Sequence, residues 1–128
     1  MKKRVGLRPK RTILCIDDDE AALNSRRRML ESANYRVLYA RSGKEGLELL
    51  HSQRVDTVLL DYWMPDQKGL EVARAIRRLK PQLPIIVLSG YASLGDEAIG
   101  LADDWFMKGD PAENLLAKIA DLVRKARK

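Results

Sequence analysis

The residues best suited to chemistry in this chain each follow directly after a short apolar run. Three consecutive aspartates, Asp17–Asp19, follow the first such run, and Asp61, Ser89 and Lys108 follow the third, fourth and fifth. Crowded carboxylates raise one another's pKa unless a cation lies among them, and hard oxygen ligands suit Mg²⁺. A carboxylate can also attack phosphorus, provided that metal, lysine or hydroxyl groups neutralise the phosphoryl oxygens. These residue types therefore predict a magnesium-assisted aspartyl phosphate site.

These groups can meet only if the apolar runs are parallel strands of one sheet. The runs predict strands at Thr12–Ile16, Tyr35–Ala40, Thr57–Leu60, Pro84–Leu88 and Trp105–Met107. Amphipathic stretches alternate with them and predict helices at Glu20–Ala33, from Ser42, over Val72–Leu79, within Ser93–Leu101 and from Asp110-Pro111. Such alternation predicts an α/β fold, with a five-stranded parallel sheet and helices on both faces. In such a sheet ligands bind beyond the carboxyl ends of the strands, where the candidate residues lie.

The positive charge of the chain is concentrated at its two ends. Of the 24 Lys/Arg residues, ten lie in residues 1–11 and 124–128, which contain no acid. Residues 12–123 therefore carry 14 basic groups against all 18 acidic ones, a net charge of −4. We expect a basic N-terminal extension (1–11), one folded domain (12–123) and a basic C-terminal tail (124–128). Solvated ends are the simplest interpretation, with diffuse binding to nucleic acid or anionic membrane as the alternative.

Composition excludes several other classes of protein. No apolar run approaches the roughly 20 residues that a membrane-spanning helix needs, and no secretory signal is visible. Cys15 is the single cysteine, so an internal disulfide is excluded, and its apolar neighbours predict a small buried hydrophobe. A cytoplasmic location is the expectation that fits these features.

Four segments of the chain resemble the receiver domain of two-component response regulators, and the single-domain chemotaxis-type receivers in particular. The segments are residues 13–19, residues 58–65 with Gly69 behind them, residues 85–90 and residues 102–108. The resemblance covers about residues 12–123. It implies a flavodoxin-like (βα)5 fold with strand order 2-1-3-4-5.

The resemblance also implies a role for each acidic residue. Asp61 would be the phosphoacceptor, and Asp17 and Asp18 would form the acidic pocket beside it. Asp18 and Asp61 would bind Mg²⁺ (or Mn²⁺) directly, together with the backbone carbonyl of Trp63. Asp17 would contact the ion through water, and no organic cofactor is implied.

On the other side of the phosphoryl group, Ser89 would donate a hydrogen bond to it and Lys108 would form an ion pair with it. Ser89 and Trp105 are the predicted switch residues, since an aromatic at this position would swing inward when Ser89 moves. The implied protein is a regulatory domain that assists its own phosphorylation and dephosphorylation, and is not otherwise an enzyme.

The implied partners are proteins. A phosphohistidine on a sensor histidine kinase or a histidine phosphotransfer protein would be the donor, and an unidentified downstream protein would be the target. The resemblance also allows a homodimer. The sequence disfavours specific nucleic-acid binding, because no recognition domain follows residue 123, and it predicts no membrane insertion.

Three positions depart from the family pattern. Gly109 follows Lys108 where similar domains have a proline joined by a cis bond. A cis bond to glycine costs about 2.5–4 kcal/mol, so we expect a trans bond or an altered loop. The segment from Ser89 to Lys108 is about three residues shorter than usual, which alters the region of the fourth helix. Lys68 replaces an Asp or Asn that often caps the third helix.

Two alternative functions follow from these features. A receiver-like scaffold that binds proteins without phosphate control would explain Gly109 and the shortened segment. A Mg²⁺-dependent phosphohydrolase of the haloacid-dehalogenase type would use Asp17 as its nucleophile, but it would leave Asp61 without a role. The receiver interpretation predicts stoichiometric modification of Asp61, whereas the phosphohydrolase predicts turnover of a phosphate ester.

Overall fold

The computed structural model describes residues 9–62, 69–90 and 100–126 of the chain. Its single described sheet has five parallel strands in the order β2-β1-β3-β4-β5, as predicted. The strands are β1 (Thr12–Ile16), β2 (Arg36–Ala40), β3 (Thr57–Asp61), β4 (Ile85–Ser89) and β5 (Asp104–Met107). The helices are α1 (Glu20–Ser32), α2 (Gly43–Ser52), α3 (Gly69–Leu79) and α5 (Ala112–Ala126). Most of the fourth helix expected within Ser93–Leu101 lies outside the described residues, although Gly100 and Leu101 are helical.

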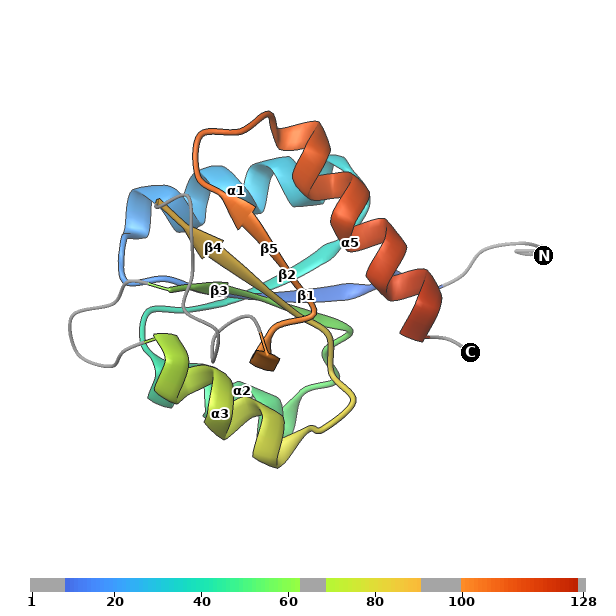
Figure 1. Cartoon of the computed structure of the whole chain (residues 1–128). Coiled ribbons are helices and arrows are strands. Elements are labelled where there is room, and N and C mark those ends of the chain that lie inside the picture. The colour runs from blue at the N-terminus through green and yellow to red at the C-terminus, as the bar shows by residue number, and fades with distance from the viewer. Residues whose placement is uncertain (1–8, 63–68, 91–99, 127–128) are drawn as a thin grey trace.

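Helices cover both faces of the sheet, with α1 and α5 on one side and α2 and α3 on the other (Figure 1). Successive residues of a strand point to opposite faces, so each buried strand contributes to both cores. In β1, for example, Ile13 and Cys15 pack with the α1/α5 core, and Leu14 and Ile16 pack with the α2/α3 core. This double burial explains why β1, β3 and β4 are continuous apolar runs in the sequence.

Side-chain caps fix where two of the helices begin. The carboxylate of Asp19 accepts hydrogen bonds from the amides of Ala21 and Ala22 at the start of α1. The hydroxyl of Ser42 accepts from the amide of Glu45, as the spacing predicts, and the Glu45 carboxylate accepts in return from the amide of Arg41. Both caps lie at the end of the sheet that carries the candidate residues.

The last helix begins one residue later than the sequence predicts. The pattern places its cap at Asp110 and its first turn at Pro111, whereas α5 begins at Ala112, with the Asn114 amide bonded to the Pro111 carbonyl. At its other end α5 continues to Ala126, so the first residues of the expected tail are helical. Terminal hydrogen bonds, which the residue pattern specifies only loosely, set these limits.

Gly69 holds the start of α3 against Tyr62, the residue that follows β3. Its amide donates to the carbonyl of Tyr62 at 3.0 Å. A Cβ atom at this position would lie 2.5 Å from that carbonyl oxygen and 2.7 Å from the Tyr62 Cα. Both of these atoms belong to the backbone and cannot rotate away, so only glycine allows this approach.

We therefore expect Gly69→Ala to lower the free energy of unfolding by about 1–3 kcal/mol, the usual range for overpacking a fixed backbone contact. Urea unfolding followed by circular dichroism measures the change. Gly100→Ala is the matched control, because a Cβ at Gly100 meets nothing within 4 Å. Equal stability of the two variants would show that the Tyr62 backbone yields to the methyl group.

Candidate functional site

The ends of β1 and β3, which are neighbours in the sheet, bring three carboxylates together. Asp17, Asp18 and Asp61 each offer a carboxylate oxygen, and these atoms all lie within 4.8 Å of one another. Asp17 is only 1% exposed and Asp61 only 2%, whereas Asp18 is partly exposed. Such a compact set of hard oxygen donors, open to solvent on one side, fits a small divalent cation such as Mg²⁺.

The lysine directly after β5 reaches into this group of carboxylates. The Nζ atom of Lys108 lies 2.6 Å from Oδ1 of Asp61, and the lysine side chain is 40% exposed. The Lys108 amide donates to the carbonyl of Ser89 at 2.7 Å, which ties the end of β5 to the end of β4. Gly109 has a φ of +98°, and the peptide bonds of the described residues are all trans. The predicted trans bond after Lys108 is thus confirmed, and the lysine still reaches Asp61.

The two predicted switch residues lie in different surroundings. Ser89 is buried at the end of β4, one residue beyond Leu88, which pairs with Asp61 in the sheet. Trp105 lies on β5 and is 37% exposed, one of two large hydrophobic side chains exposed among the described residues. The predicted carbonyl ligand of Trp63 lies outside the described residues, so its position is not part of this geometry.

Sequence reasoning missed Arg26 of α1, which forms an ion pair with Asp17 of the acidic pocket. Its guanidinium lies 3.2 Å from Oδ2 of Asp17, and its side chain is only 13% exposed. The other Asp17 oxygen, Oδ1, accepts from the amide of Asp19 at 3.0 Å. A signal was present in the sequence: Arg26 follows the buried Leu23 by three residues and precedes the buried Leu30 by four, so all three share one helix face.

Cys15 lies in the α1/α5 core with Leu23 and Leu30 of α1 and confirms the prediction of a buried hydrophobe. Burial raises the pKa of its thiol to about 12, and nearby Asp17 adds to this effect while Arg26 opposes it. A thiol with so high a pKa carries almost no thiolate at neutral pH and is a poor nucleophile. Cys15 therefore contributes packing to the domain rather than chemistry to the site.

Fold and site together define a class of protein: a flavodoxin-like α/β domain whose strand ends present carboxylates beside a lysine. The family model described as the response regulator receiver domain matches residues 13–120. The chain belongs to this family, whose members are regulatory modules of two-component signalling rather than classical enzymes. None of the helices in the described part of the chain has the length and apolar character needed to cross a membrane.

Similar proteins agree with this assignment. The chain is 42% identical over 116 residues to the response regulator MprA of Mycolicibacterium vanbaalenii, an alignment that covers 88% of the chain and 50% of that protein. The chain thus spans about half the length of the curated relatives it matches. A CheY-like receiver domain from Methanospirillum hungatei has a TM-score of 0.88 and 31% identity, and the match covers 93% of this chain and 98% of that one.

A second solved structure is that of the response regulator TrrA of Thermotoga maritima, in complex with Mg²⁺ and BeF. It has a TM-score of 0.82 and 32% identity, and the match covers 88% of this chain and 98% of that one. The two structures share the fold of this chain at identities that also support membership of the family.

Proposed function

We propose that this chain is the phosphoacceptor of a two-component phosphorelay, in which Asp61 receives a phosphoryl group from a phosphohistidine. The observation that carries this proposal is the position of Asp61. Its buried carboxylate belongs to the group formed with Asp17 and Asp18 and also accepts from Lys108 at 2.6 Å. A nucleophilic carboxylate with acidic cation ligands on one side and a fixed ammonium on the other has the parts that phosphoryl transfer needs.

Each residue has a proposed task in the transfer. An oxygen of Asp61 forms a bond to phosphorus while the bond from phosphorus to the donor's histidine nitrogen breaks, and the histidine departs. Lys108 and the Ser89 hydroxyl bind the phosphoryl oxygens, which carry the transferred charge. Asp18 and Asp61 would hold Mg²⁺ directly, with the Trp63 carbonyl as a third ligand and Asp17 acting through water. The ion, when bound, neutralises negative charge on the phosphoryl group.

The same site would start the conformational response. Ser89 ends β4 and Trp105 lies on the adjacent β5, so a movement of the Ser89 hydroxyl toward the phosphoryl group can reach the exposed surface around Trp105. The proposed donor is a sensor histidine kinase or a histidine phosphotransfer protein, and the proposed target is a downstream protein or a second copy of the chain. The Mg²⁺–BeF complex of the similar TrrA supports the choice of metal.

The first test is the intact mass of the protein after incubation with acetyl phosphate and Mg²⁺. We expect one phosphoryl group per chain, and none when a chelator removes the metal. Steady release of phosphate without an adduct would instead indicate the phosphohydrolase. A chain that takes up no phosphoryl group even from a phosphorylated histidine donor would have to act as a scaffold, although the contact between Lys108 and Asp61 favours the phosphoacceptor.

A further inference from the structure

Arg26 places a permanent positive charge against the acidic pocket from the core side of α1. Its Nη1 atom lies 3.2 Å from the Asp17 carboxylate, and both side chains are almost completely shielded from solvent. An ion pair in such surroundings is screened far less by salt and water than a surface pair. The Arg26 charge therefore contributes directly to the electrostatic potential at the site, as the carboxylates do.

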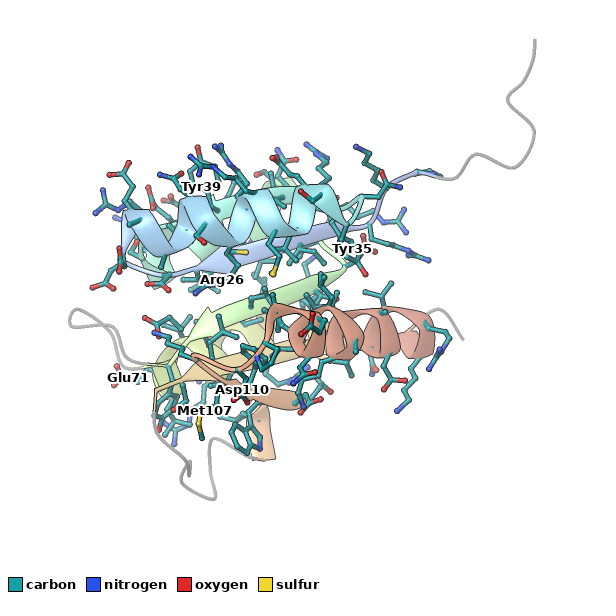
Figure 2. All side chains as sticks on the ribbon, turned by 90° about the horizontal axis from the view of Figure 1, so that it is seen from above. Arg26, Tyr35, Tyr39, Glu71, Met107 and Asp110 are labelled. Atoms are coloured by element: carbon teal, nitrogen blue, oxygen red, sulfur yellow. The ribbon has the colours of Figure 1, made fainter. Side chains whose placement is uncertain are left out.

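The neighbouring arginines show that this placement is particular to position 26. Arg27 lies over the ring of Tyr39, with its guanidinium carbon 5.7 Å from the ring centre, and Arg28 is exposed. Arg26 and Tyr39 lie on opposite sides of α1 (Figure 2). Three consecutive arginines thus point in different directions, and only Arg26 contacts a carboxylate of the group formed by Asp17, Asp18 and Asp61.

Two cations already compensate this group before any metal binds. Lys108 pairs with Asp61 at 2.6 Å and Arg26 pairs with Asp17 at 3.2 Å, so two of the three carboxylates have a cationic partner. Asp17 is engaged at both oxygens, because Oδ1 also accepts from the amide of Asp19. A divalent cation entering the pocket must either share Asp17 with the guanidinium or displace it, and in both cases the fixed charge repels the ion.

We propose that Arg26 is a built-in counter-charge that weakens the binding of divalent cations to the acidic pocket and stabilises that pocket when no ion is bound. This inference rests on the proposed function in one respect, namely that the pocket binds a divalent cation. Arg26 acts through Asp17 and is therefore a positioning residue rather than a catalytic one. Because this counter-charge weakens metal binding, the fraction of molecules that hold Mg²⁺ and can be phosphorylated depends on the Mg²⁺ concentration.

The test is a titration of the full chain with Mn²⁺, in which the electron paramagnetic resonance signal of free Mn²⁺ reports binding. Even at the dielectric constant of water, repulsion between a single and a double charge about 5 Å apart amounts to roughly a ten-fold change in affinity. We therefore expect Arg26→Met to bind Mn²⁺ about ten-fold more tightly than the wild type. Arg28→Met removes the same charge from the exposed side of the same helix and should leave the affinity unchanged.

Thermal unfolding separates this role from a merely structural one. Without metal, Arg26→Met should melt below the wild type, because the buried Asp17 carboxylate loses its partner. Saturating Mg²⁺ should raise the melting temperature of this variant more than that of the wild type. The difference between the two melting temperatures should therefore be smaller with Mg²⁺ than without it. A loss of stability that is equal with and without Mg²⁺ would indicate packing alone and would overturn the proposal.

A second variant tests the effect of the Arg26 charge on metal affinity if Arg26→Met does not fold without metal. Arg26→Gln retains a hydrogen-bond donor near Asp17 but carries no charge, so it should show the same gain in Mn²⁺ affinity. Affinity equal to or weaker than that of the wild type in Arg26→Gln or in folded Arg26→Met would overturn the proposal. Absence of Mn²⁺ binding in all variants would overturn it as well, and the phosphoryl adduct then shows separately whether the proposed function survives.

Discussion

Replacing Asp61 with asparagine is expected to abolish the transfer of a phosphoryl group to this chain. The amide of asparagine has nearly the shape of the carboxylate, but it is neither charged nor a useful nucleophile toward phosphorus. Asp61 is 2% exposed at the last position of β3, so the isosteric change leaves the strand and its pairing with Leu88 intact. Intact mass after incubation with acetyl phosphate and Mg²⁺ should show no adduct, under conditions in which the wild type is modified.

Asp110→Asn is the matched control for this variant. Asp110 is exposed and lies two residues after Lys108, so the same chemical change is made next to the site without touching its carboxylates. Its adduct should equal that of the wild type. An adduct that persists in Asp61→Asn and disappears in Asp17→Asn would assign the nucleophile to the first strand, as the haloacid-dehalogenase alternative requires.

The fold could be predicted because strands that are buried on both faces of the sheet appear in the sequence as continuous apolar runs. A run such as Ile13–Ile16 has no polar position, since alternate side chains enter the α1/α5 core and the α2/α3 core. Five such runs separated by amphipathic stretches leave little choice but a parallel sheet between two layers of helices. Helix ends were less certain because they depend on single hydrogen bonds, as the start of α5 at Ala112 shows.

The grouping of the site residues could also be predicted, because parallel strands end at a common edge. That rule alone places Asp17 and Asp61 together and brings Lys108 to the same end of the sheet, and the structure confirms both placements. The individual roles of Asp17, Asp18, Ser89 and Trp105 remain predictions.

Contacts made by long side chains between distant segments could not be predicted. Arg26 is the first of three consecutive arginines, and the helical period marks its face but not the carboxylate that it meets. Arg77 of α3 is a second case. Its guanidinium donates to the carbonyls of Leu83 and Leu101 and to the carboxylate of Asp103, and so joins α3 to the segment before β5. An arginine in a sequence can be solvated, paired or bridging, and only the folded chain distinguishes these states.

Replacing Lys108 with methionine is expected to slow the formation of the phosphoryl adduct about 100-fold, the usual effect of removing one preorganised charged donor from a transition state. Methionine keeps most of the length and the apolar stem of lysine but removes the ammonium that lies 2.6 Å from Asp61. The backbone position should persist, because the Lys108 amide is bonded to the Ser89 carbonyl and does not depend on the side chain. The rate of appearance of the adduct in the intact mass, at saturating Mg²⁺, measures the effect.

Lys118→Met provides the control, since the Lys118 side chain is about as exposed as that of Lys108 and forms an ion pair with Asp104 of β5, away from the site. Its rate should be that of the wild type. The rate of adduct formation in Lys108→Arg should lie between the rates of Lys108→Met and the wild type. A guanidinium keeps the charge but presents it in a planar fork that differs from the compact ammonium. If Lys108→Met forms the adduct as fast as the wild type, the contact with Asp61 is structural, and the neutralisation of the phosphoryl group must come from the metal and Ser89. The order of the three rates therefore decides whether the replacement of proline by Gly109 has left the lysine in its proposed role.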